Sequence, residues 1–357
     1  MKPFLLALPF SLALAAYPVL AAGVAAPLPG LGADLSQVSV SGLSSGAFMA
    51  AQIATAYSAT FKGVGVIAGG PYDCASTHPG QSPLVTAATV CMQPTSPAEV
   101  PDGAASWRSA QGRAQEGSID PVANLARQRV YLFSGTADPV VKTVVVNQVE
   151  KYYQLAGVAP AAIRYAKDVQ AGHAILTARV GDSPCGDTRA PYMNNCGFSQ
   201  AAELLRHLAG SGAKPAATGE LTGRIIEFDQ REFVRGRRSS MDDSAYAYVP
   251  AACREQSCAV HVVFHGCLQG ASEVGERFYR HAGYNEFADA NAMIVLYPQV
   301  MASKGVPANP KGCWDFWGYS SEHPAMPDFQ TRQAPQMAAV MAMLRRLGEA
   351  RAAAQAR

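Results

Sequence analysis

The chain has 357 residues, of which 49% are hydrophobic and 16% charged, and its formal net charge is +2. This composition is typical of a globular protein and excludes a disordered chain. The near-neutral charge argues against nucleic acid as a partner, because binding to phosphates normally needs a basic face. It suits a neutral substrate.

Residues 1–22 have the features of a signal peptide. Lys2 supplies a positive charge, residues 4–16 form an apolar run, and small residues suitable for cleavage follow. The alternative is an uncleaved membrane anchor, but the run is short for a span and two prolines interrupt it. We therefore expect a secreted or periplasmic protein, without membrane contact once the signal is removed.

The first strand and helix of the mature chain flank a serine. Residues 38–41 read as a short strand, Gly42-Leu43-Ser44-Ser45-Gly46 is a G-x-S-x-G pentapeptide, and small apolar residues then follow at helical spacing. A strand, sharp turn and helix of this kind lift a serine hydroxyl above the edge of a parallel sheet. We predict Ser44 as a nucleophile and the backbone N–H of Ser45 as an oxyanion donor. The alternative is an ordinary turn, since Gly and Ser are common in turns.

A carboxylate follows a later buried strand. Residues 61–70 contain a run of Val, Ile and Gly without alternation, which is typical of a parallel strand covered on both faces. Residues 129–141 read as a further strand. Asp138 lies in the segment 135–140 with which this strand ends, at the sheet edge where open α/β sheets bind ligands. It is a candidate to orient a histidine, or else a cap for the helix expected at 143–155.

His173 is the predicted general base. It follows Gly172 in a loop after a short strand within residues 161–175. The chain order Ser44, Asp138, His173 is that of the Ser, Asp and His of α/β-hydrolases. The other six histidines lack this combination of strand, loop and order.

The second half of the chain predicts more strands of the same sheet. His265, Gly266 and Cys267 end a strongly apolar strand, an arrangement that supplies a second oxyanion amide in α/β-hydrolases. The alternative is a plain strand-ending turn. The other elements expected here are a helix at 199–208, a linker-like loop, a hairpin of strands 227–234 and 244–253, the apolar strand 259–270, a helix at 272–290, a strand at 291–300 and a final helix at 330–354.

In most α/β-hydrolases the strand with the second oxyanion amide precedes the nucleophile, whereas here it comes late in the chain. Circular permutation of one sheet explains this order, since a separate 224–357 domain would lack its own nucleophile, acid and histidine. We therefore predict a single catalytic domain at 23–357. Its expected fold is a circularly permuted α/β-hydrolase with a mostly parallel central sheet flanked by helices. The N–H of Cys267 would join that of Ser45, with His265 shaping the loop.

An even number of cysteines in an exported chain predicts disulfides. Spacing suggests two local pairs and a loop-closing pair, and the remaining two cysteines then form the fourth. No Cys-x-x-Cys pair is present, so a zinc ribbon or redox site is not expected. The suggested pairs are Cys185 with Cys196, Cys253 with Cys258, Cys74 with Cys91, and Cys267 with Cys313.

Residues 311–319 concentrate aromatic side chains, including Trp314 and Trp317. The ordinary interpretation is core packing, which accounts for most tryptophans. The functional interpretation is an apolar wall beside the active site, held there if Cys313 is bonded to Cys267. We favour the second.

Five motifs together resemble the circularly permuted, single-domain poly(3-hydroxybutyrate) depolymerases. They are residues 41–74, Ser-Gly-Thr-Ala-Asp-Pro-Val-Val at 134–141, Gly-His at 172–173, Phe-His-Gly-Cys-Leu-Gln-Gly at 264–270 and residues 312–319. The resemblance covers about residues 36–330. It implies a secreted serine esterase that takes a polyester chain or oligomer, with a Ser44–His173–Asp138 triad and oxyanion amides from Ser45 and Cys267. It also implies that Trp314 or Trp317 lines the substrate crevice.

No metal or cofactor is expected for this chemistry, and we expect a monomer. Two alternatives stay open. One is another exported carboxylesterase of the feruloyl or acetyl-xylan type, which uses a similar nucleophile turn and His-Gly loop. The other is a non-catalytic polymer-binding protein on a hydrolase fold.

Overall fold

The structure is a computed structural model that describes residues 25–78, 80–234, 238–323 and 326–351. The predicted signal peptide at 1–22 lies outside these residues and stays a prediction. Within the described residues, no helix is both long and apolar enough to cross a bilayer.

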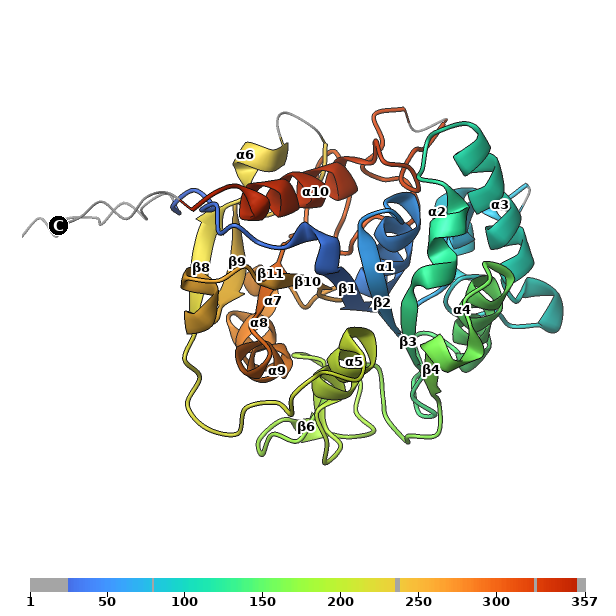
Figure 1. The fold of residues 1–357 in the computed structure, drawn as a ribbon. Helices are drawn as coiled ribbons and strands as arrows, with labels where there is room; N and C mark the ends of the chain where they lie inside the picture. The colour runs from blue at the N-terminus through green and yellow to red at the C-terminus, as the bar shows by residue number, and fades with distance from the viewer. Residues whose placement is uncertain (1–24, 79, 235–237, 324–325, 352–357) are drawn as a thin grey trace, which may run out of the picture.

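An eight-stranded sheet forms the centre of the molecule (Figure 1). Six adjacent strands are parallel and the last two pair antiparallel at one edge. In spatial order the strands are β4 (Ile163–Ala166), β3 (Arg129–Phe133), β2 (Phe61–Ile67), β1 (Val38–Leu43), β10 (Ala259–Phe264), β11 (Met293–Tyr297), β9 (Ser244–Val249) and β8 (Arg224–Asp229).

Strand β1 is the first strand of the sheet in sequence, yet it lies in the middle of the sheet, between β2 and β10. Its register with β10 runs from Val38 opposite Val260 to Gly42 opposite Phe264. Because the two strands are parallel and end together, the residues that follow them start side by side at the same sheet edge. The linker-like loop near 210–220 therefore does not separate two sheets.

Helices cover both faces of the sheet. In Figure 1, α1 and α10 lie on one side of the strands, and α5 and α9 lie on the other. Helix α3 packs on α4, which contacts β3. The helices are α1 (Ser45–Ala56), α2 (Pro83–Ala88), α3 (Gly103–Gln115), α4 (Thr143–Leu155), α5 (Gln200–Ala209), α6 (Arg231–Val234), α7 (Ala271–Val274), α8 (Arg277–His281), α9 (Tyr284–Ala290) and α10 (Pro335–Gly348).

A second parallel sheet has three short strands and is separate from the central sheet. Its order is β5 (Ile175–Thr177), β7 (Met193–Asn195) and β6 (Ser183–Pro184). The Cys185–Cys196 disulfide closes the chain between β6 and the end of β7. This sheet organises the segment that follows His173.

Several predicted elements differ from the structure. The helix predicted at 272–290 is three short helices, because Gly275 and Gly283 adopt positive φ values of 62° and 90°. The predicted strand 227–234 ends at Asp229, whose carboxylate accepts the backbone N–H of Arg231 as helix α6 starts. Strand β9 stops before Pro250 rather than at residue 253, since proline has no N–H for the ladder.

The final helix predicted at 330–354 is also shorter than expected. It begins at Pro335, where proline suits the first helical position, and ends at Gly348. Residues 352–354 of the prediction lie outside the described part of the chain. The antiparallel pairing of β8 with β9 agrees with the predicted hairpin.

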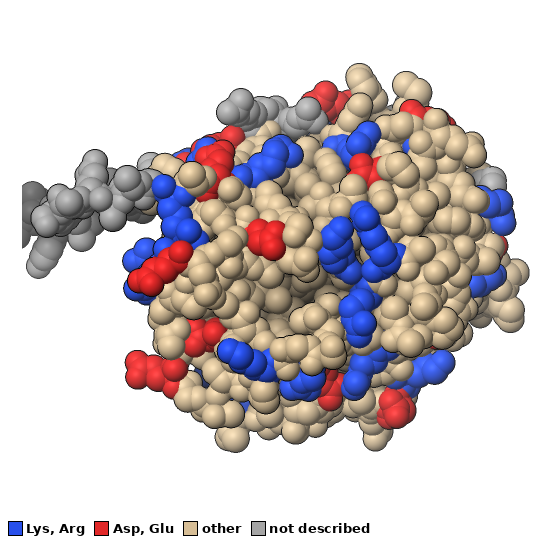
Figure 2. Space-filling model, in the orientation of Figure 1, with Lys and Arg blue, Asp and Glu red and all other residues tan. Residues whose placement is uncertain are grey.

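Uncharged residues cover most of the face shown in Figure 2, and both acidic and basic side chains are scattered over the rest. This agrees with the charged fraction of 16% in the sequence. The interior is correspondingly apolar. Val, Ile, Leu and Phe side chains of β1, β2, β3, β10 and β11 are almost all fully buried.

Gly46, in the first turn of α1, lets that helix touch the end of β10. A Cβ atom built on Gly46 would lie 2.4 Å from the carbonyl oxygens of both Phe264 and His265. These atoms are backbone, so they cannot move aside as a flexible side chain would. The closeness of α1 to β10 therefore requires a glycine here.

We expect Gly46→Ala to lower the free energy of unfolding by about 2 kcal/mol or more, because backbone must shift to admit the methyl group. Gly112→Ala is the matched control, since Gly112 is interior to α3 and a Cβ there meets nothing within 4 Å. It should raise stability by up to about 1 kcal/mol. Urea unfolding of both variants checks this, and equal stability of the two would contradict it.

Candidate functional site

Ser44 lies in a strained turn between β1 and α1. Its backbone has φ 57° and ψ −123°, a conformation that a non-glycine residue rarely adopts. A Cβ on Gly42 would lie 2.3 Å from the backbone of Gly46, so the turn closes only with glycine at both places. The side chain of Ser44 is 6% exposed. This is the geometry predicted for a nucleophile at the top of a parallel sheet.

Asp138 and His173 are in direct contact. Nδ1 of His173 lies 2.8 Å from Oδ2 of Asp138, and both side chains are almost completely buried. The other carboxylate oxygen of Asp138 accepts the backbone N–H groups of Val140 and Val141 at 2.7 and 3.1 Å. Asp138 therefore both caps its turn and orients the imidazole. Nε2 of His173 is left as the nitrogen that can exchange a proton.

The loop that carries His173 is held by the segment between Cys185 and Cys196. The N–H of His173 donates to Oγ1 of Thr188 at 2.9 Å, and that of Gly172 donates to the carbonyl of Cys185 at 2.9 Å. A Cβ on Gly172 would lie 2.1 Å from the Asp187 carbonyl oxygen. These contacts fix the position of the imidazole relative to the sheet edge.

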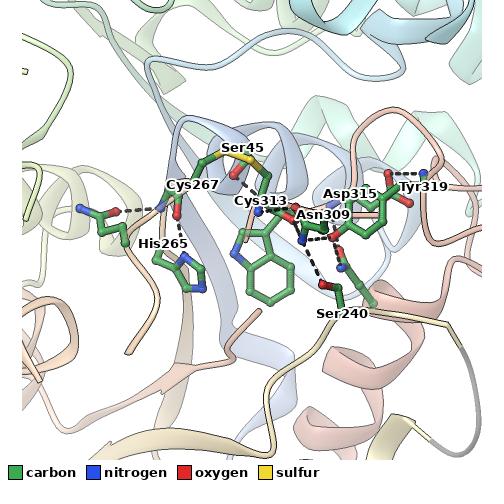
Figure 3. The surroundings of a disulfide bond; sticks show 12 residues. Ser45, Ser240, His265, Cys267, Asn309, Cys313, Asp315 and Tyr319 are labelled. Carbon is green, nitrogen blue, oxygen red and sulfur yellow. Dashed lines mark hydrogen bonds between the residues drawn. A yellow bond between two sulfur atoms is a disulfide. The ribbon is translucent and has the colours of Figure 1, made fainter. Parts of the chain in front are cut away.

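The loop after β10 lies against Ser44. A Cβ built on Gly266 would be 3.5 Å from Cβ of Ser44. The N–H groups of Gly266 and Leu268 donate to Oε1 of Gln269 and to the carbonyl of Lys311. Between them, the N–H of Cys267 has no acceptor among the described residues. Figure 3 shows this loop beside Ser45, whose own N–H is at the start of α1.

His265 does not have the surroundings of a general base. Its Nδ1 contacts the carbonyl oxygen of Gly266 at 2.7 Å (Figure 3). Its Nε2 accepts the N–H of Val300 at 3.2 Å. The first nitrogen therefore carries the proton and the second does not. Complete burial lowers the pKa of His265 to about 4. The ring is a neutral support for the loop, as the sequence suggested.

All four predicted disulfides are present, and none of the eight cysteines is free. The bond from Cys267 to Cys313 joins the loop after β10 to the aromatic segment, and the backbone N–H of Trp314 donates to Oγ of Ser45 (Figure 3). The pairs are Cys74–Cys91, Cys185–Cys196, Cys253–Cys258 and Cys267–Cys313.

The two tryptophans of the aromatic segment differ in exposure. Trp314 is 0% exposed and packs against the rings of Phe264 and His265. The prediction that it lines a substrate wall is therefore wrong for this structure, because its ring belongs to the core. Trp317 is partly exposed and packs on Phe316, which stacks on Phe48 of α1 with ring centroids 4.1 Å apart.

A second serine and histidine contact lies inside the sheet. Oγ of Ser41 is 2.8 Å from Nε2 of His261, and Oγ of Ser39 is 2.7 Å from its Nδ1. Ser41 and His261 are fully buried, and burial lowers the pKa of His261 to about 3. No carboxylate bonds to His261 among the described residues. Asp315 contacts Gln336 of α10 through its backbone N–H. Its carboxylate accepts backbone N–H groups of its own turn, at residues 317–320.

This internal pair has the residue types of a hydrolase site but not its geometry. A polymer could not reach Ser41, and neither nitrogen of His261 is free to exchange a proton with a substrate. Among the described residues, no group of three or more His, Cys, Asp or Glu side chains gathers as a metal site would require.

Relatives of known name cover most of this chain. A poly(3-hydroxybutyrate) depolymerase from Delftia acidovorans is 43% identical over 326 residues, which are 90% of this chain and 61% of that protein. A polyhydroxybutyrate depolymerase from Talaromyces funiculosus is 37% identical over 314 residues, 84% of this chain and 87% of that protein. No family model matches the chain.

Solved structures give the same result. The crystal structure of a PHB depolymerase from Penicillium funiculosum matches with a TM-score of 0.79 at 33% identity, covering 90% of this chain and 98% of that one. A PHB depolymerase variant with one serine replaced by alanine, complexed with an R3HB trimer, matches equally well.

The two buried histidines predict how stability depends on pH. Their pKa values in the folded protein, about 3 and about 4, lie below the value of 6.5 for an unfolded histidine. Below pH 6.5 the unfolded chain therefore binds protons that the folded chain does not. The contribution of these two histidines to the free energy of unfolding is fully present above pH 6.5. It should decrease as the pH falls from 6.5 to 4, by up to about 3 kcal/mol per pH unit for both histidines together.

Urea midpoints at several pH values between 7.5 and 4.5 measure this dependence. His261→Gln removes one of the two groups. The part of the slope of unfolding free energy against pH that comes from these histidines should therefore be roughly halved in this variant. A slope that is unchanged in the variant would contradict the assignment.

Proposed function

Because this chain belongs to the poly(3-hydroxybutyrate) depolymerase family, we propose that it hydrolyses the ester bonds of poly(3-hydroxybutyrate) or its oligomers. The observation that carries the proposal is the Asp138–His173 contact at the same sheet edge as the strained turn of Ser44. The chain spans 61% of the length of the Delftia relative, so activity and substrate are taken from the site as well as from the family.

The proposed reaction begins with Ser44. Its hydroxyl attacks the ester carbonyl while Nε2 of His173 takes the proton, and Asp138 holds the imidazole in the required tautomer and stabilises its charged form. The alcohol end of the polyester leaves with that proton. Water, deprotonated by His173, then attacks the acyl-enzyme, and His173 returns that proton to Oγ of Ser44 as the acid leaves. No further group is needed to balance these steps.

Two backbone amides would stabilise the tetrahedral intermediate. The N–H of Ser45 lies at the N-terminus of α1, and the N–H of Cys267 belongs to the loop beside Ser44. A donor of this kind typically contributes about 3 kcal/mol to lowering the barrier. Neither N–H has an acceptor among the described residues, so both can bind the oxyanion without breaking another hydrogen bond.

The substrate proposal rests on the comparisons and on the wall of the site. One solved neighbour is titled as a complex with an R3HB trimer, a short piece of the same polyester. The partly exposed Trp317 is the tryptophan we propose for contact with the polyester chain. Its edge-to-face contact with Phe316 connects it to α1 through Phe48. An apolar wall suits a neutral polyester.

We also propose that the chain is exported and acts as a monomer. Four disulfides suit an oxidising compartment, and the segment at 1–22 has the composition of a signal peptide. Circular permutation belongs to the same proposal. It is supported by the strand order, in which the strand before the nucleophile comes first in sequence and lies mid-sheet.

Substitution of two serines tests the nucleophile. Ser44→Ala should lower kcat/KM for a short nitrophenyl ester by roughly 10⁴-fold or more, because the acyl-enzyme cannot form. Ser41→Ala is the matched control at the other serine and histidine contact, and it should keep most of the activity. Survival of hydrolysis in Ser44→Ala, or its loss only in Ser41→Ala, would show that the nucleophile is wrongly assigned.

Loss of turbidity from an amorphous poly(3-hydroxybutyrate) suspension tests the substrate. The parent protein should clear the suspension and release 3-hydroxybutyrate or its short oligomers. With Ser44→Ala the suspension should stay turbid and no hydroxybutyrate should be released. Feruloylated and acetylated xylan serve as competing substrates. Faster release of ferulate or acetate than of hydroxybutyrate would favour the alternative esterase classes.

A further inference from the structure

The direction of the Cys267 N–H is set by the carbonyl of the same peptide unit. A trans peptide is planar, so its C=O and N–H groups point in opposite directions. The carbonyl of Gly266 accepts the Nδ1–H of His265 at 2.7 Å. The N–H of Cys267 therefore points away from the buried ring of His265. A rotation of this one peptide unit would remove the oxyanion donor.

The preceding peptide unit is held by Gln269. The N–H of Gly266 donates to Oε1 of Gln269 at 2.7 Å, and Nε2 of Gln269 donates to the carbonyls of Pro191 and Tyr192, both at 3.1 Å. The side chain of Gln269 is 0% exposed. Its amide thus accepts one bond and donates two, which leaves both ends of the group satisfied.

The segment that Gln269 reaches also holds the proposed base. Thr188, which is three residues before Pro191, accepts the backbone N–H of His173. The Cys185–Cys196 disulfide closes this stretch of chain. Gln269 consequently connects the loop of the oxyanion donor to the segment that fixes the imidazole. The three interactions join parts of the chain up to 78 residues apart in sequence.

We propose that Gln269 is a positioning residue for the reaction, a role that rests on the function proposed above. It fixes the peptide units around Gly266, so that the N–H of Cys267 faces the developing oxyanion beside Ser44. It has no contact with the reacting atoms itself. Because the oxyanion forms only in the transition state, loss of this positioning lowers kcat and leaves ground-state binding nearly unchanged.

Gln269→Met tests the role, because methionine has a similar length and keeps the volume but makes none of the three hydrogen bonds. Gln128→Met is the matched control. Gln128 is also 0% exposed, and its Nε2 donates to two carbonyls, those of Ala54 and Phe61, away from the strand ends that carry the site. Both variants lose comparable buried hydrogen bonds, so both are expected to melt at a lower temperature than the parent.

The measurements are kcat and KM on a short nitrophenyl ester, with active sites counted by phosphonate titration, and the affinity of a boronic acid that forms a tetrahedral adduct. For Gln269→Met we expect kcat to fall about tenfold to a hundredfold, less than full loss of an oxyanion donor. KM should stay within about twofold, and the boronic acid should lose affinity by the same factor as kcat. Gln128→Met should keep the parent's kcat.

Three results would overturn the proposal: a kcat per active site within twofold of the parent, an equal loss of kcat in Gln128→Met, or a loss of kcat without a matching loss of boronic acid affinity. Failure of the proposed function is separate from these. It would appear as a parent protein that does not hydrolyse the ester, or as hydrolysis that survives Ser44→Ala.

Discussion

The site depends on the parallel pairing of β1 with β10. This register, from Val38 opposite Val260 to Gly42 opposite Phe264, ends the two strands together although they are far apart in sequence. The turn of Ser44 and the loop of Cys267 then begin side by side. Gly46 allows the first turn of α1 to lie against the carbonyls at the end of β10, so the two amides proposed to bind the oxyanion belong to elements in close backbone contact.

Around this pairing, irregular segments are held by covalent and buried polar links. The Cys267–Cys313 bond joins the loop after β10 to the aromatic segment, and the Cys185–Cys196 bond closes the segment that holds His173. Loops tolerate functional groups well only when a rigid scaffold fixes them. The neutral ring of His265 and the amide of Gln269 hold the loop after β10 through hydrogen bonds to the backbone of Gly266.

Much of the fold could be predicted because its signals are local. The Ser44 turn, the apolar strands and Asp138 after a strand end each occupy a few neighbouring residues, and the disulfide partners followed from spacing. The three-way break of the 272–290 helix was missed because glycine is tolerated in helices, and only the fold forces positive φ at Gly275 and Gly283. Burial of Trp314 follows from its packing on β10, which composition cannot show. Thr188 and Gln269 were missed because their partners are distant in sequence, although Gln269 stands only two residues after Cys267.

A crystal structure of the protein inactivated by a phosphonate ester would show which groups surround the reacting serine. We expect phosphorus bonded to Oγ of Ser44, with the phosphoryl oxygen within about 3 Å of the backbone nitrogens of Ser45 and Cys267. Nε2 of His173 should face the leaving-group side. Phosphorus on another serine, or a phosphoryl oxygen turned away from the Cys267 amide, would contradict this expectation.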